Sequence, residues 1–217
     1  FDEAQASFKK AAKDKEILRP AIVGLAAVLK DAGRFDEALA ELESLLIKDP
    51  ANAAAWAALA DAQFDAGMEA AAEVALLRAI RNKPANAAFH LRLAFQKSQR
   101  ARYKEAEAIY RALLAKGAAK LAVVHAGLAQ ALISQGRLDE AEESLNQAQA
   151  LDPQLIDIFL ARARSRFLSG RLPEAWADYE WRKRHIDFTP PHLPVPVWDG
   201  TPLNGRSILL LGEQGAG

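Results

Sequence analysis

Two arginines in the C-terminal third of the chain have a spacing that suits them to bind a charged group. Arg162 and Arg166 are four residues apart, so both guanidinium groups lie on one face of a helix. A buried guanidinium needs a carboxylate partner, or its charged head must reach water. One interpretation is docking of the tail or of a following domain. The other, which we favour, is a local ion pair with Asp157, Glu174 or Asp178.

The two histidines in the middle of the chain do not suggest a metal site. His90 and His125 lack the short spacing of a helical zinc pair, and we interpret both as packing residues. The sequence has no cysteine, which excludes disulfides and cysteine-based metal sites. It also shows no activated nucleophile and no paired carboxylate site. We therefore expect no catalytic residue, no metal and no cofactor within these residues.

The overall charge is balanced, with 28 basic and 28 acidic residues among 217. This composition gives no electrostatic footprint for nucleic acid or for an anionic membrane surface. The apolar stretches are too short and too interrupted to span a bilayer. Together with the lack of cysteine, these features lead us to expect a cytoplasmic protein with no nucleic-acid or membrane partner.

The elements that hold these side chains repeat along the chain. Alanines recur every 34 or 35 residues, at Ala4, Ala38, Ala72, Ala106, Ala141 and Ala175. Five residues before each of the last five stands Gly33, Gly67, Ala101, Gly136 or Gly170. Glycine permits a turn between two helices, and alanine lets two helices approach closely. The period predicts stacked helical hairpins, because one hairpin alone cannot bury its apolar face.

We place a half repeat at 1–18 and full repeats at 19–52, 53–86, 87–120, 122–155 and 156–189, so that the array occupies about 1–185. The third repeat has Ala118 where a proline is expected, and Lys120 and Leu121 flank a one-residue insertion there. We expect a slightly irregular junction there.

The phrases GRFDEALAELESLLIKDPANAAAW and GRLDEAEESLNQAQALDP resemble the tetratricopeptide repeat (TPR) family. The resemblance implies an all-α fold, a right-handed solenoid of antiparallel helix pairs whose first helices line a concave face that binds a protein or peptide. The positions expected there are Val23, Lys30, Asp61, Phe64, Leu91, Phe95, Gln130, Ile133, Leu160, Arg164 and Phe167. Their apolar character suits an amphipathic helix. The alternative is that the three phenylalanines pack between neighbouring repeats.

The composition changes after His185. Residues 186–206 are rich in proline and predict an extended linker, anchored by Trp198. The apolar run from Ser207 predicts the first strand of an incomplete α/β domain, and the glycine-rich turn follows at 212–217. The chain begins at Phe1 and stops within that turn, so we expect a fragment of a longer protein.

The stretch EAWADYEWRKR, the prolines and WDGTPLNGRSILLLGEQGAG resemble bacterial proteins that join TPR arrays to a glycosyltransferase domain. The resemblance implies a GT-B type domain that starts at 207, with Gly215 and Gly217 in a turn near its cleft. A nucleotide-sugar donor would bind only in the part that follows. It implies an array that recruits a protein acceptor, such as a flagellin. The alternative is an adaptor or assembly scaffold without chemistry.

Overall fold

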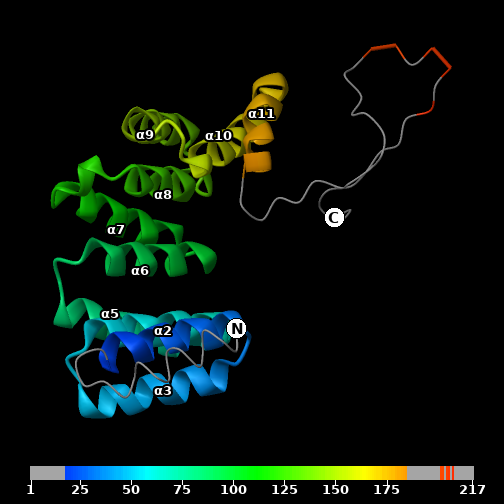
Figure 1. Ribbon diagram of the computed structural model, residues 1–217. Coiled ribbons are helices and arrows are strands. Elements are labelled where there is room, and N and C mark those ends of the chain that lie inside the picture. Colours follow the sequence, from blue (N-terminus) through cyan, green and yellow to red (C-terminus); the bar gives the residue numbers. More distant parts are fainter. Residues whose placement is uncertain (1–17, 185–200, 203, 206, 208–217) are drawn as a thin grey trace.

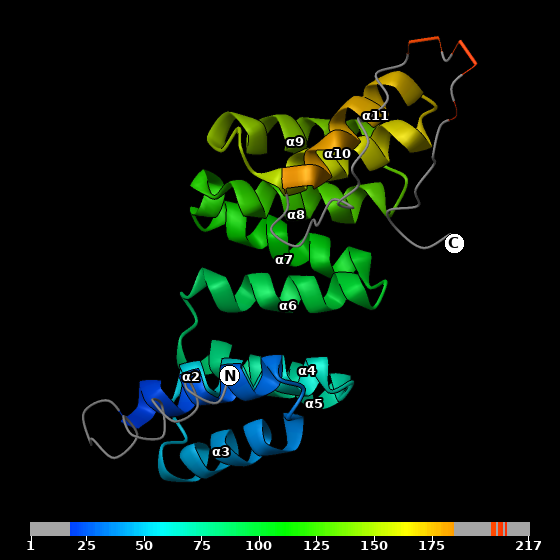
Figure 2. The same ribbon diagram turned by 45° about the vertical axis from the view of Figure 1, so that its right-hand side comes forward.

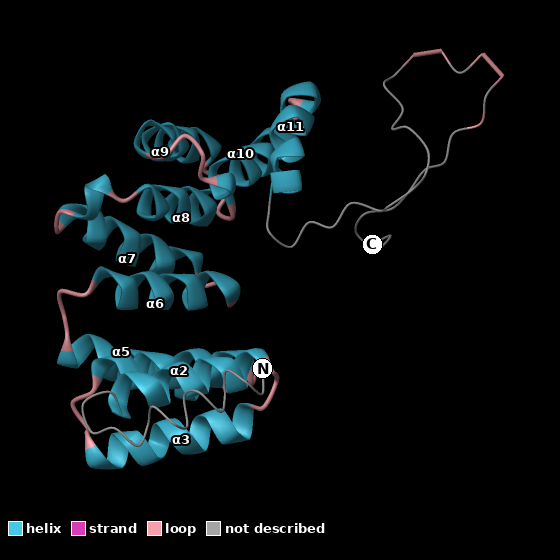
Figure 3. Ribbon diagram, in the orientation of Figure 1, coloured by secondary structure: helices cyan, strands magenta, loops and turns pink. Residues whose placement is uncertain are grey.

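The computed structural model describes residues 18–184, 201–202, 204–205 and 207 of the chain. These residues contain ten α-helices, two short 3-10 helices and no strand (Figures 1 and 3). The helices are α2 Leu18–Asp31, α3 Phe35–Lys48, α4 Ala53–Asp65, α5 Glu69–Asn82, α6 Ala87–Gln99, α7 Tyr103–Ala115, α8 Ala122–Ile133, α9 Leu138–Leu151, α10 Ile156–Leu168 and α11 Leu172–Tyr179, with 3-10 turns at Ala118–Lys120 and Glu180–Arg184.

Consecutive helices pack in pairs, α2 with α3, α4 with α5, α6 with α7, α8 with α9, and α10 with α11. The pairs stack one on another along a single direction (Figure 2). The predicted all-helical solenoid is therefore confirmed. The linker expected at 186–206 and the strand and turn expected at 207–217 lie almost wholly outside the described residues, as do Trp198, Gly215 and Gly217.

The recurring alanines mark the tightest crossings. Each alanine of the column that the structure describes has 0% of its surface exposed, namely Ala38, Ala72, Ala106, Ala141 and Ala175. One helical turn further on, Leu42, Leu76 and Leu145 are also fully buried. A larger side chain in the alanine column would push the two helices of a pair apart.

The turn between the helices of a pair needs a left-handed residue. Gly33, Gly67, Gly136 and Gly170 have φ between +73° and +77°, a conformation that glycine adopts without steric cost. In the third pair the same position holds Ala101, which has φ +56°. The Cβ atom of alanine is sterically strained in this conformation, whereas glycine has no Cβ atom.

The connection between α7 and α8 differs from the earlier ones. Asn52 and Asn86 cap α4 and α6, each accepting a hydrogen bond of 3.0 Å from a backbone N–H of the first turn. Before α8 the N-cap position holds Leu121, which makes no side-chain cap. The chain instead turns at Gly117, where φ is +95°, and forms the 3-10 helix Ala118–Lys120.

Gly127 in the middle of α8 makes room for an aromatic ring. A Cβ atom at this position would lie 2.4 Å from Cζ of Tyr110 on α7, closer than any side chain tolerates. Burial of the Tyr110 ring raises the pKa of its hydroxyl to about 12. The glycine therefore costs α8 some helix propensity and allows α7 to pack against it.

The first helices of successive pairs are not equally close. α2 packs on α4 and α8 packs on α10, whereas α4 and α6 hardly touch along their backbones. The buried residues form two clusters, one centred on α2–α5 that includes Phe89 and Leu93, and one that runs from Ala94 to Ala161. The solenoid is thus continuous in connectivity but has a weaker junction in its middle.

Candidate protein-binding surface

The predicted binding positions lie on α2, α4, α6, α8 and α10, and we call their common side the first-helix face. Its central feature is an aromatic pair at the α4–α6 junction. The rings of Phe64 and Phe95 have centroids 6.3 Å apart and are tilted by 58°, an arrangement typical of attractive ring pairs. Phe95 nevertheless keeps 52% of its surface exposed. The two interpretations of these rings therefore combine, because the pair packs between repeats and still presents a ring to solvent.

Two ion pairs flank the aromatic pair. Arg92 of α6 donates to Oδ2 of Asp61 on α4 at 2.6 Å, and Lys30 of α2 donates to Oδ2 of Asp65 at 2.8 Å. Burial raises the pKa of the Asp61 carboxyl, although Arg92 and Lys30 act in the opposite direction. The first-helix face over α2, α4 and α6 is thus an aromatic centre within a charged rim.

The remaining predicted positions divide by exposure. Gln130 and Arg164 are exposed, and Val23, Leu91 and Leu160 are half-buried. The prediction is wrong for Ile133, because only 2% of its surface is exposed and it belongs to the core. Phe167 is half-buried, but its ring packs on α11 of its own pair, 4.9 Å from Trp176. Phe167, Trp176 and Tyr179 form a second aromatic cluster, whose exposed ring, Trp176, lies on the second helix α11 and not on the first-helix face.

Arg162 and Arg166 form the local ion pair that we favoured. Arg162 donates to both oxygens of Asp178, at 2.9 and 2.8 Å, and Arg166 donates to Oδ2 of the same carboxylate at 2.7 Å. Only 5% of Asp178 is exposed, and the bidentate geometry makes the interaction strong. Both arginines hold α10 and α11 together. Docking of a following domain on them stays an untested prediction.

The sequence analysis missed a set of ion pairs between successive repeats. Glu73 of α5 is bound by Lys97, by Arg100 at 3.1 Å and by Arg102 at 3.0 Å. One repeat later, Glu107 accepts hydrogen bonds from Arg137 at 2.7 Å and from Gln135 at 2.8 Å. The signal was present in the sequence, since Glu73, Glu107 and Glu142 recur with the same period as Arg102, Arg137 and Arg171.

These contacts shift the titration of the glutamates. Burial of Glu107 would raise the pKa of its carboxyl, but hydrogen bonds from Gln135 and Arg137 outweigh it, so the pKa lies below its ordinary value. The hydrogen bond from Lys97 lowers the pKa of Glu73. Both carboxylates therefore stay ionised in the fold at neutral pH.

His90 has a structural partner. Its Nε2 donates to the carbonyl oxygen of Pro84 at 2.9 Å, as Trp56 Nε1 donates to the carbonyl of Pro50 at 2.8 Å one repeat earlier. Within the described residues, no three His, Asp or Glu side chains gather as metal ligands would. None of the helices in 18–184 combines the length and the apolar character needed to cross a bilayer.

Several solved structures share this architecture. MamA of strain AMB-1 is 24% identical with a TM-score of 0.58, over 73% of this chain and 94% of its own. The type IV pilus biogenesis factor PilW is 22% identical with a TM-score of 0.69, over 80% of each chain. YrrB, a TPR protein with an unusual peptide-binding site, is 18% identical with a TM-score of 0.57, over 82% of this chain and 91% of its own. At these identities the likeness shows the fold alone.

No curated protein matches the sequence. The model of the tetratricopeptide repeat matches it three times, over residues 1–61, 29–94 and 98–166. These matches cover well over half of the chain and all or most of each helix from α2 to α10. The chain belongs to the tetratricopeptide repeat family of protein-interaction modules.

Proposed function

We propose that the first-helix face over α2, α4 and α6 binds an amphipathic helix of another protein. The observation that carries this proposal is Phe95, a large aromatic side chain that is 52% exposed beside a second ring. Aromatic residues dominate the energetics of protein interfaces, because they bury a large area with few rotatable bonds. YrrB, a protein of this fold, has a peptide-binding site, which supports a peptide segment as the ligand.

The charged rim limits what the partner presents. Asp61, Arg92, Lys30 and Asp65 already neutralise one another in pairs, so the face offers an apolar centre within a rim that has little net charge. An amphipathic helix fits this arrangement, because it places apolar side chains on one stripe and polar ones beside it. An extended acidic peptide would find no uncompensated cation at these four positions.

The test uses the full chain as bait to select helical peptides from a displayed library, followed by fluorescence anisotropy on an enriched peptide. We expect Phe95→Ser to weaken binding at least about tenfold, which is the loss of one well-packed anchor. The matched control is Val74→Ser, because Val74 is similarly exposed, at 56%, but lies on the second helix α5. Circular dichroism should show unchanged helicity in both. Failure to enrich any peptide, or equal affinities for the two variants, would contradict the proposal.

The wider role that we propose is recruitment of a protein acceptor to a bacterial glycosyltransferase. Its support is the sequence from Pro173 to Gly217, which resembles the region where TPR arrays join such enzymes. The nucleotide-sugar donor would then bind in the catalytic domain, outside the residues described here. Flagellins are a suitable acceptor class, because their amphipathic terminal helices match an apolar face.

A transfer assay separates this role from that of an adaptor or assembly scaffold. The protein expressed from the whole gene is incubated with labelled nucleotide sugars and a flagellin. Incorporation of label that depends on Phe95 would support acceptor recruitment. Binding without incorporation under any donor would favour the adaptor.

A further inference from the structure

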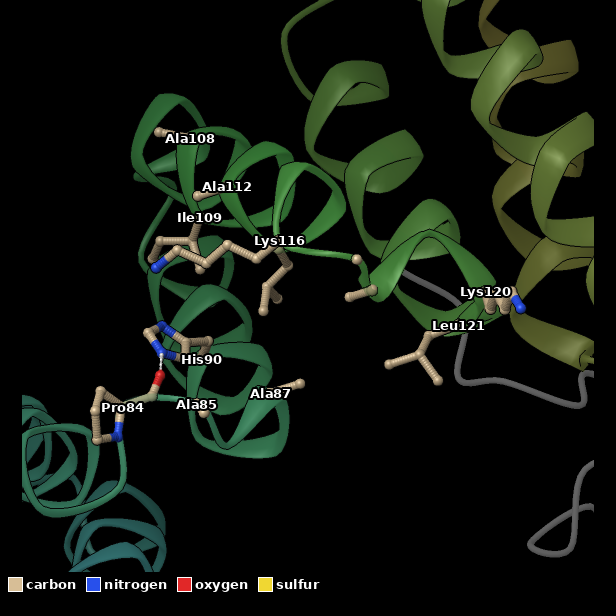
Figure 4. Close-up of a pocket in the computed structure, with 13 residues that line it drawn as sticks. Pro84, Ala85, Ala87, His90, Ala108, Ile109, Ala112, Lys116, Lys120 and Leu121 are labelled. Atoms are coloured by element: carbon tan, nitrogen blue, oxygen red, sulfur yellow. Dashed lines mark hydrogen bonds between the residues drawn. The ribbon is translucent and has the colours of Figure 1, made fainter.

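An open pocket of about 640 Å³ lies at the edge of the third helix pair (Figure 4), and Phe95 is not among the residues that line it. It is bounded by the loop before α6, the C-terminal half of α7 and the irregular connection before α8. Its walls include His90, Ile109, Ala112, Leu113 and Lys116. The volume lies in the range of sites that hold small ligands or single side chains.

The same place one repeat earlier is filled by the chain itself. There Trp56 takes the position of His90, and the guanidinium of Arg78 lies 5.2 Å from the centre of its ring. Arg78 corresponds to Ala112, and Asn82, whose amide reaches the carbonyl of Pro50 at 3.4 Å, corresponds to Lys116. The cavity therefore exists because an alanine replaces the group that would cover the ring.

The last helix pair shows which kind of side chain can fill the place of Ala112. Phe159 occupies the place of His90, and Trp181 occupies that of Ala112. Their rings stack with centroids 3.5 Å apart and an interplanar angle of 4°. In two of the repeats, then, a planar group covers the ring of the first helix, from the second helix α5 in one case and from the 3-10 turn Glu180–Arg184 that follows α11 in the other. At His90 this cover is missing, while the floor is more apolar than one repeat earlier, since Ile109 and Leu113 stand where α5 has Ala75 and Ala79.

Lys116 adds a charge to this cavity. Its side chain extends toward Ile109 and His90, whereas Lys120 points away (Figure 4). Among residues 18–184 Lys116 has no ion-pair partner, although Lys30 and Lys97 are both paired. An ammonium group beside an apolar floor favours an anion that carries a hydrophobic body.

We propose that this cavity binds an aromatic carboxylate, with the ring over His90 and Ile109 and the carboxylate on Nζ of Lys116. Both a free aromatic acid and the C-terminal aromatic residue of a protein present this chemistry. The site shares no residue with the aromatic pair of the first-helix face, so this proposal can be tested independently of the proposed peptide binding.

The first experiment titrates the isotope-labelled chain with N-acetyl-tryptophan and with its uncharged amide, followed by NMR. We expect saturable shifts at Ala112, Gly117 and Lys116, and an affinity for the acid several-fold higher than for the amide. In Lys116→Gln the acid and the amide should bind equally. Absence of saturable shifts, or equal affinities in the unaltered chain, overturns the proposal.

A second variant tests the location. Ala112→Trp should fill the cavity as Trp181 does in the last pair, and should weaken binding at least tenfold. Ala150→Trp on α9, an exposed alanine, is the matched control and should bind normally, as should Phe95→Ser. Persistence of binding in Ala112→Trp overturns the proposal. A tetrapeptide that ends in tryptophan then distinguishes the sources, since tighter binding than N-acetyl-tryptophan assigns the site to protein C-termini and equal binding assigns it to small acids.

Discussion

The junction between α4 and α6 and the junction between α8 and α10 use the same positions of the repeat but pack differently. At the α8–α10 junction the backbones are close, and Ile133, Leu132 and Ala161 are nearly or fully buried. At the α4–α6 junction the corresponding positions hold Phe64, Gln63 and Arg92. There the two backbones hardly approach each other, the contact is made by side chains, and one of the facing rings remains exposed.

The difference follows from side-chain size and polarity. Ala161 lets α10 approach α8, whereas Arg92 keeps α6 away from α4 and forms an ion pair with Asp61. Helix α6 also buries Gln96 and Lys97, where α8 buries Ala131 and Leu132. Ion pairs thus replace apolar contact at the middle junction. The comparison teaches that a repeat array can leave an aromatic side chain exposed where it gives up tight packing between neighbours.

The largest effect should come from truncating the close junction. Ile133→Ala removes a side chain that is 2% exposed and should cost about 2–5 kcal/mol of unfolding free energy, because it leaves a cavity. The matched Phe64→Ala, at the open junction, should cost less, about 1–2 kcal/mol, because Phe64 is only partly buried and packs on a ring, Phe95, that is itself exposed. Urea unfolding measures both, and equal costs would mean that the two junctions do not differ.

The next test exchanges the residues that set the spacing. Ala161→Arg introduces a long charged side chain at a position that is 4% exposed and should destabilise by about 1–3 kcal/mol through overpacking. Arg92→Ala should change stability by less than about 1 kcal/mol, as expected for an exposed ion pair. If Ala161→Arg proves as mild as Arg92→Ala, size at this position does not control the approach of the helices.

The open junction should also depend on pH. The pKa of Glu73 is lowered, first by the hydrogen bond from Lys97. Its ion pairs therefore stabilise the fold above the unfolded-state pKa, near about 4.3, and this stabilisation is lost as the pH falls through the lower folded-state value. Glu73→Gln should cost about 1–2 kcal/mol at neutral pH.

That cost should vanish once the pH has fallen below the lowered folded-state pKa of Glu73, because the carboxyl is then protonated in both states. The cost of Ile133→Ala, which involves no titrating group, should be similar at both pH values. A cost of Glu73→Gln that stays constant across this range would show that the ion pairs around Glu73 do not hold the junction.

The smallest effect concerns the turn beside the open junction. Ala101→Gly should raise the unfolding free energy by up to about 1 kcal/mol, because alanine is strained at φ +56°. The control is Gly136→Ala in the next pair, where φ is +76°, and it should lower stability by a similar amount. Thermal unfolding followed by circular dichroism reports both changes, and opposite signs are the expected result.

The helices and their crossings could be predicted from the sequence because they depend on local patterns that repeat. The alanine column and the glycine column each impose one geometric condition per repeat, and the structure fulfils both. Burial of Ile133 could not be predicted, because it depends on how closely α10 approaches α8. The exposed fraction of Phe95 depends likewise on how closely α6 approaches α4, where Arg92 of α6 faces Asp61. Such properties arise between repeats, where one position has a different neighbour each time.

The ion pairs of Arg162 and Arg166 with Asp178 affect which part of the array unfolds first. Where the preceding pair has Leu128 and Leu132, the last pair has two arginines on a buried carboxylate. Helix α11 also packs on Phe167, but it has only 8 residues. In a linear array each pair draws support from its neighbours alone. Fraying should therefore begin at α11, and its amides should exchange with solvent hydrogen well before those of α8 and α9.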